Sequence, residues 1–166
     1  MLRSRVLRWP TEKLLTKNAD TTLRLAVEAA SLDGADQVSP KHLLLGILKN
    51  GRGVAVHCLR KLGLDTDESL GELMSARPAD NPLPEHDPEK GPYIEAAIKQ
   101  ARLQAHSLGH RYIGTEHLLL GLIDENHSWG ARFLKRSGIT YPLLRNQVID
   151  FLQEPPPPVG RGDEPK

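Results

Sequence analysis

The motif HLLLGIL at residues 42–48 recurs as HLLLGLI at residues 117–123. The offset is 75 residues (117 − 42 = 75), and the similarity continues on both sides of the motif without a gap. Identical pairs at this offset include Ala26 and Ala101, Ala30 and Ala105, Gly34 and Gly109, Leu59 and Leu134, and Gly63 and Gly138. Self-similarity at a fixed period indicates one structural unit used more than once. We therefore predict a tandem duplication of one small unit.

The first copy has the apolar spacing of short helices. We predict helices near residues 20–32, from Ser39-Pro40 to the break at Asn50 and Gly51, near 54–62 and near 66–75. Asp20 is the predicted N-cap of the first helix, and Gly34 is expected to end it at the C′ position. Pro40 suits the first turn of the second helix because that position needs no backbone N–H.

The second copy repeats this scheme, with helices predicted near 93–108, 116–124, 128–137 and 141–152. Aromatic residues make up only 4% of the chain, so the core is expected to consist of Leu, Val, Ile and Ala. We find no run of alternating residues typical of strands, and the predicted class is a small all-α fold.

Proline-rich segments divide the chain. We predict an N-terminal segment at 1–10, a first repeat at 11–75, a linker at 76–92, a second repeat at 93–152 and a disordered Pro-rich tail at 153–166. Segments rich in proline and charge pack poorly and favour extended or disordered chain.

The overall composition excludes several classes of protein. The 22 Lys and Arg nearly balance the 21 Asp and Glu, which is not the clustered basic character of a nucleic-acid binder. No apolar stretch is long enough for a membrane span. Cys58 is the only cysteine, so no internal disulfide can form and a reducing compartment is expected. We expect a cytoplasmic protein.

No catalytic motif is present. The chain contains no P-loop, no G-x-S-x-G, no H-E-x-x-H and no C-x-x-C, so we expect no catalytic residues, no cofactor and no metal. His106 and His110 have the i, i+4 spacing of metal ligands on one helix face. Gly109, at the expected helix end, lies between them, so a surface or turn role is favoured over a metal site. His42 and His117 occupy matched positions beside leucine stripes, where a packing or helix-start role is favoured over catalysis.

The starts of the two second helices differ. The second copy reads Gly114-Thr115-Glu116-His117, whereas the first reads Ser39-Pro40-Lys41-His42. A helix N-terminus can hold an anion, and Glu116 could at the same time hold a guanidinium, so Thr115 and Glu116 are the candidate ligand-binding residues. The alternative is structural: Thr115 caps the helix and Glu116 interacts with its dipole.

The segment GTEHLLLGLI, preceded by an A-x-x-x-A helix ending in SLGHRYI, resembles the N-terminal domain of the Clp ATPases. The nearest match is the ClpC and ClpA branch of the Hsp100 unfoldases, and the resemblance covers residues 11–152. It implies a tandem repeat of two four-helix units packed as a pseudo-two-fold helical bundle. It also implies binding of adaptors and substrates, and of phosphorylated arginine through the Glu of G-T-E-H. Thr115 and Glu116 match that motif, whereas Pro40 and Lys41 do not.

The expected function is that of a non-enzymatic protein-binding module in Clp-type protein quality control. Its partners would be adaptor proteins, substrate proteins or Clp ATPase and protease subunits, without nucleic acid or membrane. One alternative is a phosphoarginine-sensing domain with a single site in the second repeat. Another is an excised N-domain of a larger Clp ATPase; Met1 and the charged tail favour a stand-alone protein over this alternative.

Overall fold

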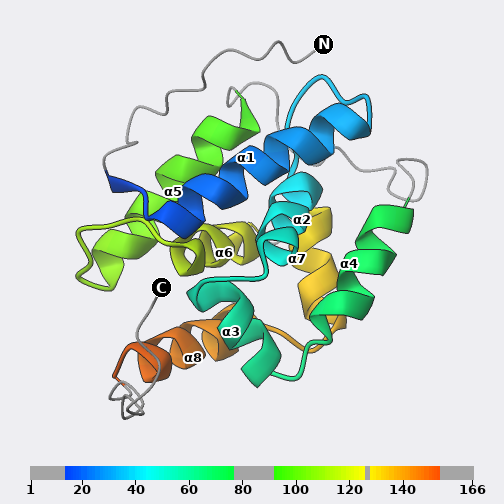
Figure 1. The fold of residues 1–166 in the computed structure, drawn as a ribbon. Helices are drawn as coiled ribbons and strands as arrows, with labels where there is room; N and C mark the ends of the chain where they lie inside the picture. Colours follow the sequence, from blue (N-terminus) through cyan, green and yellow to red (C-terminus); the bar gives the residue numbers. More distant parts are fainter. Residues whose placement is uncertain (1–13, 77–91, 126–127, 154–166) are drawn as a thin grey trace, which may run out of the picture.

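The computed structural model describes residues 14–76, 92–125 and 128–153, which form an all-helical bundle (Figure 1). Within these ranges there are eight helices and no strand: α1 (Lys17–Leu32), α2 (Pro40–Asn50), α3 (Val54–Lys61), α4 (Thr66–Ser75), α5 (Tyr93–Ser107), α6 (Thr115–Asp124), α7 (Trp129–Arg136) and α8 (Tyr141–Gln153). The predicted fold class is confirmed. Most of the predicted linker, the N-terminal segment at 1–10 and nearly all of the tail lie outside the described residues.

Helix α1 begins earlier than predicted. Its N-cap is Thr16, whose side chain accepts a hydrogen bond from the backbone N–H of Ala19, so the prediction of Asp20 as N-cap is wrong. Asp20 lies in the first turn instead and accepts a hydrogen bond from Arg24 at 2.9 Å. Gly34 follows the helix with a φ of 66°, in the left-handed conformation expected of a C′ glycine.

Helices α2 and α6, which carry the repeated motif, lie in the centre of the bundle (Figure 1). Each is covered by the first helix of its own repeat, because α1 packs along α2 and α5 packs along α6. Each also contacts a helix of the other repeat: α3 packs against α6, and α7 packs against α2. The two repeats therefore share one core, and neither buries its apolar face alone.

Glycine sets how closely α1 approaches α2. A Cβ added at Gly46 would lie 2.5 Å from the backbone oxygen of Thr22 and 2.9 Å from the backbone nitrogen of Ala26. The matched Gly121 leaves more room, since an added Cβ would lie 3.1 Å from the Cβ of Gln100. The first helix pair is therefore packed more tightly than the second.

A parallel β-bridge joins the start of the first repeat to the loop before α6. The backbone N–H of Thr16 donates to Ile113 at 2.9 Å, and the N–H of Ile113 donates to Leu14 at 2.8 Å. These bonds hold in place the segment between α5 and α6, which carries His110 and Tyr112. None of the helices in the described ranges combines the length and apolar character that crossing a bilayer requires.

Candidate functional site

A histidine turns back onto the start of each central helix. In α2 the backbone N–H of Ser39 donates to Nδ1 of His42 at 3.0 Å, and in α6 the N–H of Gly114 donates to Nδ1 of His117 at 2.8 Å. A backbone N–H can only donate, so each Nδ1 must carry a lone pair. A ring in this state has its proton on Nε2. The sequence interpretation of the matched histidines as hydrogen-bonding residues at the helix start therefore agrees with the structure.

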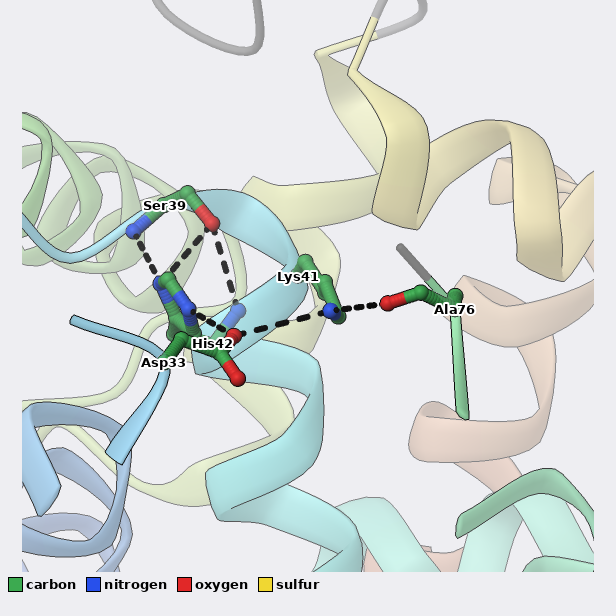
Figure 2. Close-up of polar contacts among 5 residues, drawn as sticks. All are labelled: Asp33, Ser39, Lys41, His42 and Ala76. Carbon is green, nitrogen blue, oxygen red and sulfur yellow. Dashed lines mark hydrogen bonds and ion pairs between the residues drawn. The ribbon is translucent and has the colours of Figure 1, made fainter. Parts of the chain in front are cut away.

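In the first repeat, Nε2 of His42 meets a carboxylate (Figure 2). Its distance to Oδ2 of Asp33 is 2.8 Å. Burial acts to raise the pKa of Asp33, but the hydrogen bond from His42 and the charge of Lys41 hold that pKa below its usual value. Nζ of Lys41 lies 3.5 Å from the same carboxylate oxygen and donates to the backbone oxygen of Ala76 at 2.9 Å. This polar cluster is satisfied by its own residues.

In the second repeat, Nε2 of His117 meets another histidine. It lies 2.7 Å from Nδ1 of His110, whose ring stacks on Tyr112 with 5.0 Å between ring centroids. His117 is fully buried. Burial and the neighbouring His110 lower the pKa of His117 to about 4, and burial also lowers the pKa of His110. A neutral histidine pair thus replaces the histidine–carboxylate pair of the first repeat.

Glu116 folds back over the start of its own helix. Its side chain is 2% exposed, and its carboxylate occupies the space that a Cβ at Gly114 would need. Its Oε1 has no hydrogen-bond partner among the described residues. Burial raises the pKa of Glu116, although hydrogen bonds from its own backbone and from Tyr112 oppose this effect. Burial and the charge of Glu116 in turn raise the pKa of the Tyr112 phenol.

Thr115 does not cap its own helix, so that part of the structural alternative is wrong. The N-cap of α6 is Gly114. Oγ1 of Thr115 instead accepts a hydrogen bond of 3.1 Å from the backbone N–H of Ala55, in the first turn of α3. Helix α3 needs this acceptor because its own N-cap is Gly53, which has no side chain. A residue of the second repeat therefore caps a helix of the first.

The pseudo-two-fold counterpart of this contact is built differently. Pro40 stands where Thr115 stands in the other repeat, and it has no hydroxyl group. Helix α7 uses its own N-cap instead, since Oγ of Ser128 accepts a hydrogen bond from Ala131 at 3.1 Å. Helix α7 is thus capped from within its own repeat, whereas α3 takes its cap from the other repeat.

Replacing Thr115 with valine is expected to lower the free energy of unfolding by about 2 kcal/mol, because the buried N–H of Ala55 loses its acceptor. Urea unfolding followed by circular dichroism measures this loss. Thr115→Ser keeps the hydroxyl group and removes one methyl, which costs about 1 kcal/mol or less. Equal losses in the two variants would show that the hydrogen bond contributes nothing.

The fold brings together three potential metal ligands. Ligand atoms of His110, Glu116 and His117 lie within 4.8 Å of one another. We expected no metal from the sequence, where His110 was considered only with His106. The hydrogen bonds oppose ligation, because the lone pair on Nδ1 of His117 faces the N–H of Gly114 and its Nε2 carries a proton. These side chains therefore suit hydrogen bonding better than metal binding.

Sequence reasoning missed the pairing of His110 with His117 and the contact of Tyr112 with Glu116. The glycine at 109 signalled that α5 ends before His110, and α5 does end at Ser107. No local pattern indicated where the segment after this helix turns. The β-bridge at Ile113 decides its path, and that bridge depends on a residue of the other repeat.

Comparison with known proteins gives consistent matches. The model of the Clp repeat (R) N-terminal domain family matches residues 14–93 and 90–166. The chain is 34% identical over 140 residues to the negative regulator of genetic competence ClpC/MecB of Bacillus subtilis, covering 82% of this chain and 17% of that protein. It is 31% identical over 147 residues to the chloroplastic chaperone protein ClpC2 of Oryza sativa, covering 89% of this chain and 16% of that protein. The chain thus spans about a sixth of the length of these relatives.

Solved structures share the fold. The N-terminal domain of ClpD from Arabidopsis thaliana superposes with a TM-score of 0.62 at 21% identity, covering 92% of this chain and all of that one. The Hsp104 N-terminal domain from Candida albicans gives a TM-score of 0.61 at 15% identity, covering 84% of this chain and 91% of that one. At these identities the likeness shows a common architecture and no more.

Proposed function

We propose that this chain, which belongs to the Clp repeat (R) N-terminal domain family, is a non-enzymatic module that binds proteins in Clp-type protein quality control. Its partners are adaptor proteins, substrate proteins or the subunits of a Clp ATPase or protease. We place it in the cytoplasm, where its single buried cysteine stays reduced.

The observation that carries this proposal is the match of both repeats to one family of Clp N-terminal domains. Relatives above 30% identity are named as the negative regulator of genetic competence ClpC/MecB and the chaperone protein ClpC2, and the matched part is a small fraction of each. The polar groups at the helix starts give further support. The side chains of His42, Lys41 and Thr115 already form internal hydrogen bonds, as expected for a scaffold and not for a catalyst.

Affinity capture tests the proposal. The tagged chain is mixed with a lysate of its source organism, and the retained proteins are identified by mass spectrometry against a tag-only control. We expect enrichment of Clp ATPases, Clp protease subunits or their adaptors. A purified candidate is then titrated with the untagged chain to show that binding is direct and saturable. Recovery of none of these proteins would reject the proposal.

A second candidate function is recognition of phosphoarginine at Glu116 and Thr115. It is favoured by the buried Oε1 of Glu116, which lacks a hydrogen-bond partner among the residues described. A guanidinium carries several N–H donors that would satisfy this oxygen. The hydroxyl proton of Thr115 stays available as a donor to a phosphoryl group. Both side chains are 2% exposed, so this function requires the loop before α6 to open.

Isothermal titration with free phosphoarginine checks the second candidate. We expect saturable binding that is lost in Glu116→Ala, because the guanidinium loses its carboxylate. Since burial raises the pKa of Glu116, the fraction of ionised carboxylate, and with it the affinity, is expected to rise with pH in the weakly acidic range. Glu95→Ala, in the first turn of α5, is the control and should bind unchanged. Binding that survives Glu116→Ala would remove this residue from the site.

A further inference from the structure

A small pocket lies between the end of α5 and the loop before α6. Its volume is about 270 Å³, and neither Thr115 nor Glu116 lines it. Four of its eight lining residues are arginine or histidine, and none is acidic: Arg102, His106, His110 and Arg111. Tyr112 and apolar side chains complete the wall. The chain as a whole is nearly neutral, with a formal charge of +1, so this collection of basic groups is local.

The two arginines make no polar contact elsewhere in the part of the fold that the structure describes. Arg102 and Arg111 are exposed, and neither forms an ion pair or hydrogen bond with any residue that the structure describes. By contrast, Arg136 pairs with Glu72 at 2.8 Å and Arg24 pairs with Asp20 at 2.9 Å. Guanidinium groups offer only donors, in a planar arrangement that matches carboxylate and phosphoryl oxygens.

His110 adds a hydrogen-bond donor. A chain of hydrogen bonds that starts at a backbone N–H decides which of its ring nitrogens carries the proton. The N–H of Gly114 donates to Nδ1 of His117, so the proton of His117 lies on Nε2 and is donated to Nδ1 of His110. The neutral ring of His110 then carries its own proton on Nε2. This nitrogen is on the far side of the ring from His117. The pocket-lining His110 therefore carries an N–H group, and not a lone pair, at Nε2.

We propose that this pocket binds an oxyanion, the carboxylate or phosphoryl group of an acidic side chain on a protein bound by this domain. The inference rests on the proposed protein-binding function and names the chemistry that one of its surfaces recognises. The guanidinium groups of Arg102 and Arg111 favour an anion, because they carry positive charge and offer only donors. A cation would find no carboxylate among the lining residues. The stacked Tyr112 and His110 rings add an apolar surface beside the charged groups.

Peptide titration tests the pocket directly. The probes are three short peptides that differ at one central position, which holds phosphoserine, glutamate or serine, and inorganic phosphate as a fourth. Binding is followed by two-dimensional NMR of the isotope-labelled chain. We expect saturable shifts at residues 102–113 with the phosphoserine or the glutamate peptide, and none with the serine peptide. The stronger of the two acidic peptides identifies the source of the oxyanion.

The decisive test is a double variant that combines Arg102→Gln with Arg111→Gln. It removes two positive charges from the pocket. We expect the double variant to weaken peptide binding at least about tenfold, equivalent to roughly 1.4 kcal/mol. The matched control, Arg132→Gln with Lys135→Gln, removes the same charge from exposed positions on α7 and should bind as the wild type does. Both pairs lie on the surface, so the fold should be kept.

Two outcomes of the peptide titration would overturn the proposal. One is that neither acidic peptide binds. The other is that both double variants weaken binding equally, which would mark a non-specific effect of net charge. If the pocket variant still captures the same Clp proteins with unchanged affinity, the pocket assignment fails while the protein-binding function stands. If no Clp protein is captured but the acidic peptides still bind, the proposed function fails separately.

Discussion

Gly46→Ala is expected to lower the free energy of unfolding by about 3 kcal/mol, although alanine is the better helix former. The added Cβ would lie 2.5 Å from the backbone oxygen of Thr22 and 2.9 Å from the backbone nitrogen of Ala26. Backbone atoms cannot turn aside as a side chain can, so α1 would have to move away from α2. The roughly 1 kcal/mol gained in helix propensity does not offset that displacement. Urea unfolding at neutral pH measures the change.

The repeat provides the matched control. Gly121 is the counterpart of Gly46, and an added Cβ there would lie 3.1 Å from the Cβ of Gln100 and 3.3 Å from the backbone nitrogen of Ala101. A shift of a few tenths of an ångström relieves these contacts. The gain in propensity is then expected to keep Gly121→Ala within about 1 kcal/mol of the wild type. Similar losses in both variants would show that the close approach at Gly46 does not limit the packing.

Acid should destabilise the fold through His117. The pKa of this buried residue is lowered from 6.5 to about 4, which corresponds to about 3 kcal/mol at roughly 1.4 kcal/mol per pH unit. Between these two values the unfolded chain binds a proton at His117 and the folded chain does not. The free energy of unfolding therefore falls as the pH falls from 6.5 towards 4, and is fully retained above 6.5.

Unfolding by urea at pH 7 and pH 4.5 separates this contribution from that of other groups. His117→Asn keeps an acceptor for the N–H of Gly114 but cannot titrate, so it should lose about 2–3 kcal/mol less than the wild type between the two pH values. His106→Asn, at an exposed position, should behave as the wild type. NMR titration of the His117 ring protons gives a second readout if the variant unfolds. Equal acid losses in wild type and His117→Asn would contradict the assignment.

The helical layout was largely predictable because its causes are local. The Ser39-Pro40 start, the glycines after α1 and α5 and the apolar stripes all act within a few residues of the chain. The predicted bounds accordingly agree with the structure to within a few residues. Asp20 was the exception: a good capping residue lies in the first turn because Thr16, just upstream, caps the helix instead.

The candidate site was predictable only in part. The sequence pointed to Thr115 and Glu116 and to the contrast with Pro40 and Lys41, and each of these side chains has a distinct role in the structure. It could not show that Glu116 is 2% exposed or that Thr115 reaches Ala55. The two partners of that hydrogen bond are sixty positions apart, and the helical spacing that guided the sequence analysis relates only residues within a few positions of each other.

By itself, then, the sequence determined the duplication, the helical class and the inequality of the two repeats. Those properties follow from spacing and from residue types that interact with near neighbours. Only the tertiary structure decided that Thr115 of the second repeat caps a helix of the first, that His117 meets His110 where His42 meets Asp33, and that basic side chains surround one pocket. These features arise where segments distant in the chain meet, and the β-bridge and the shared core bring those segments together.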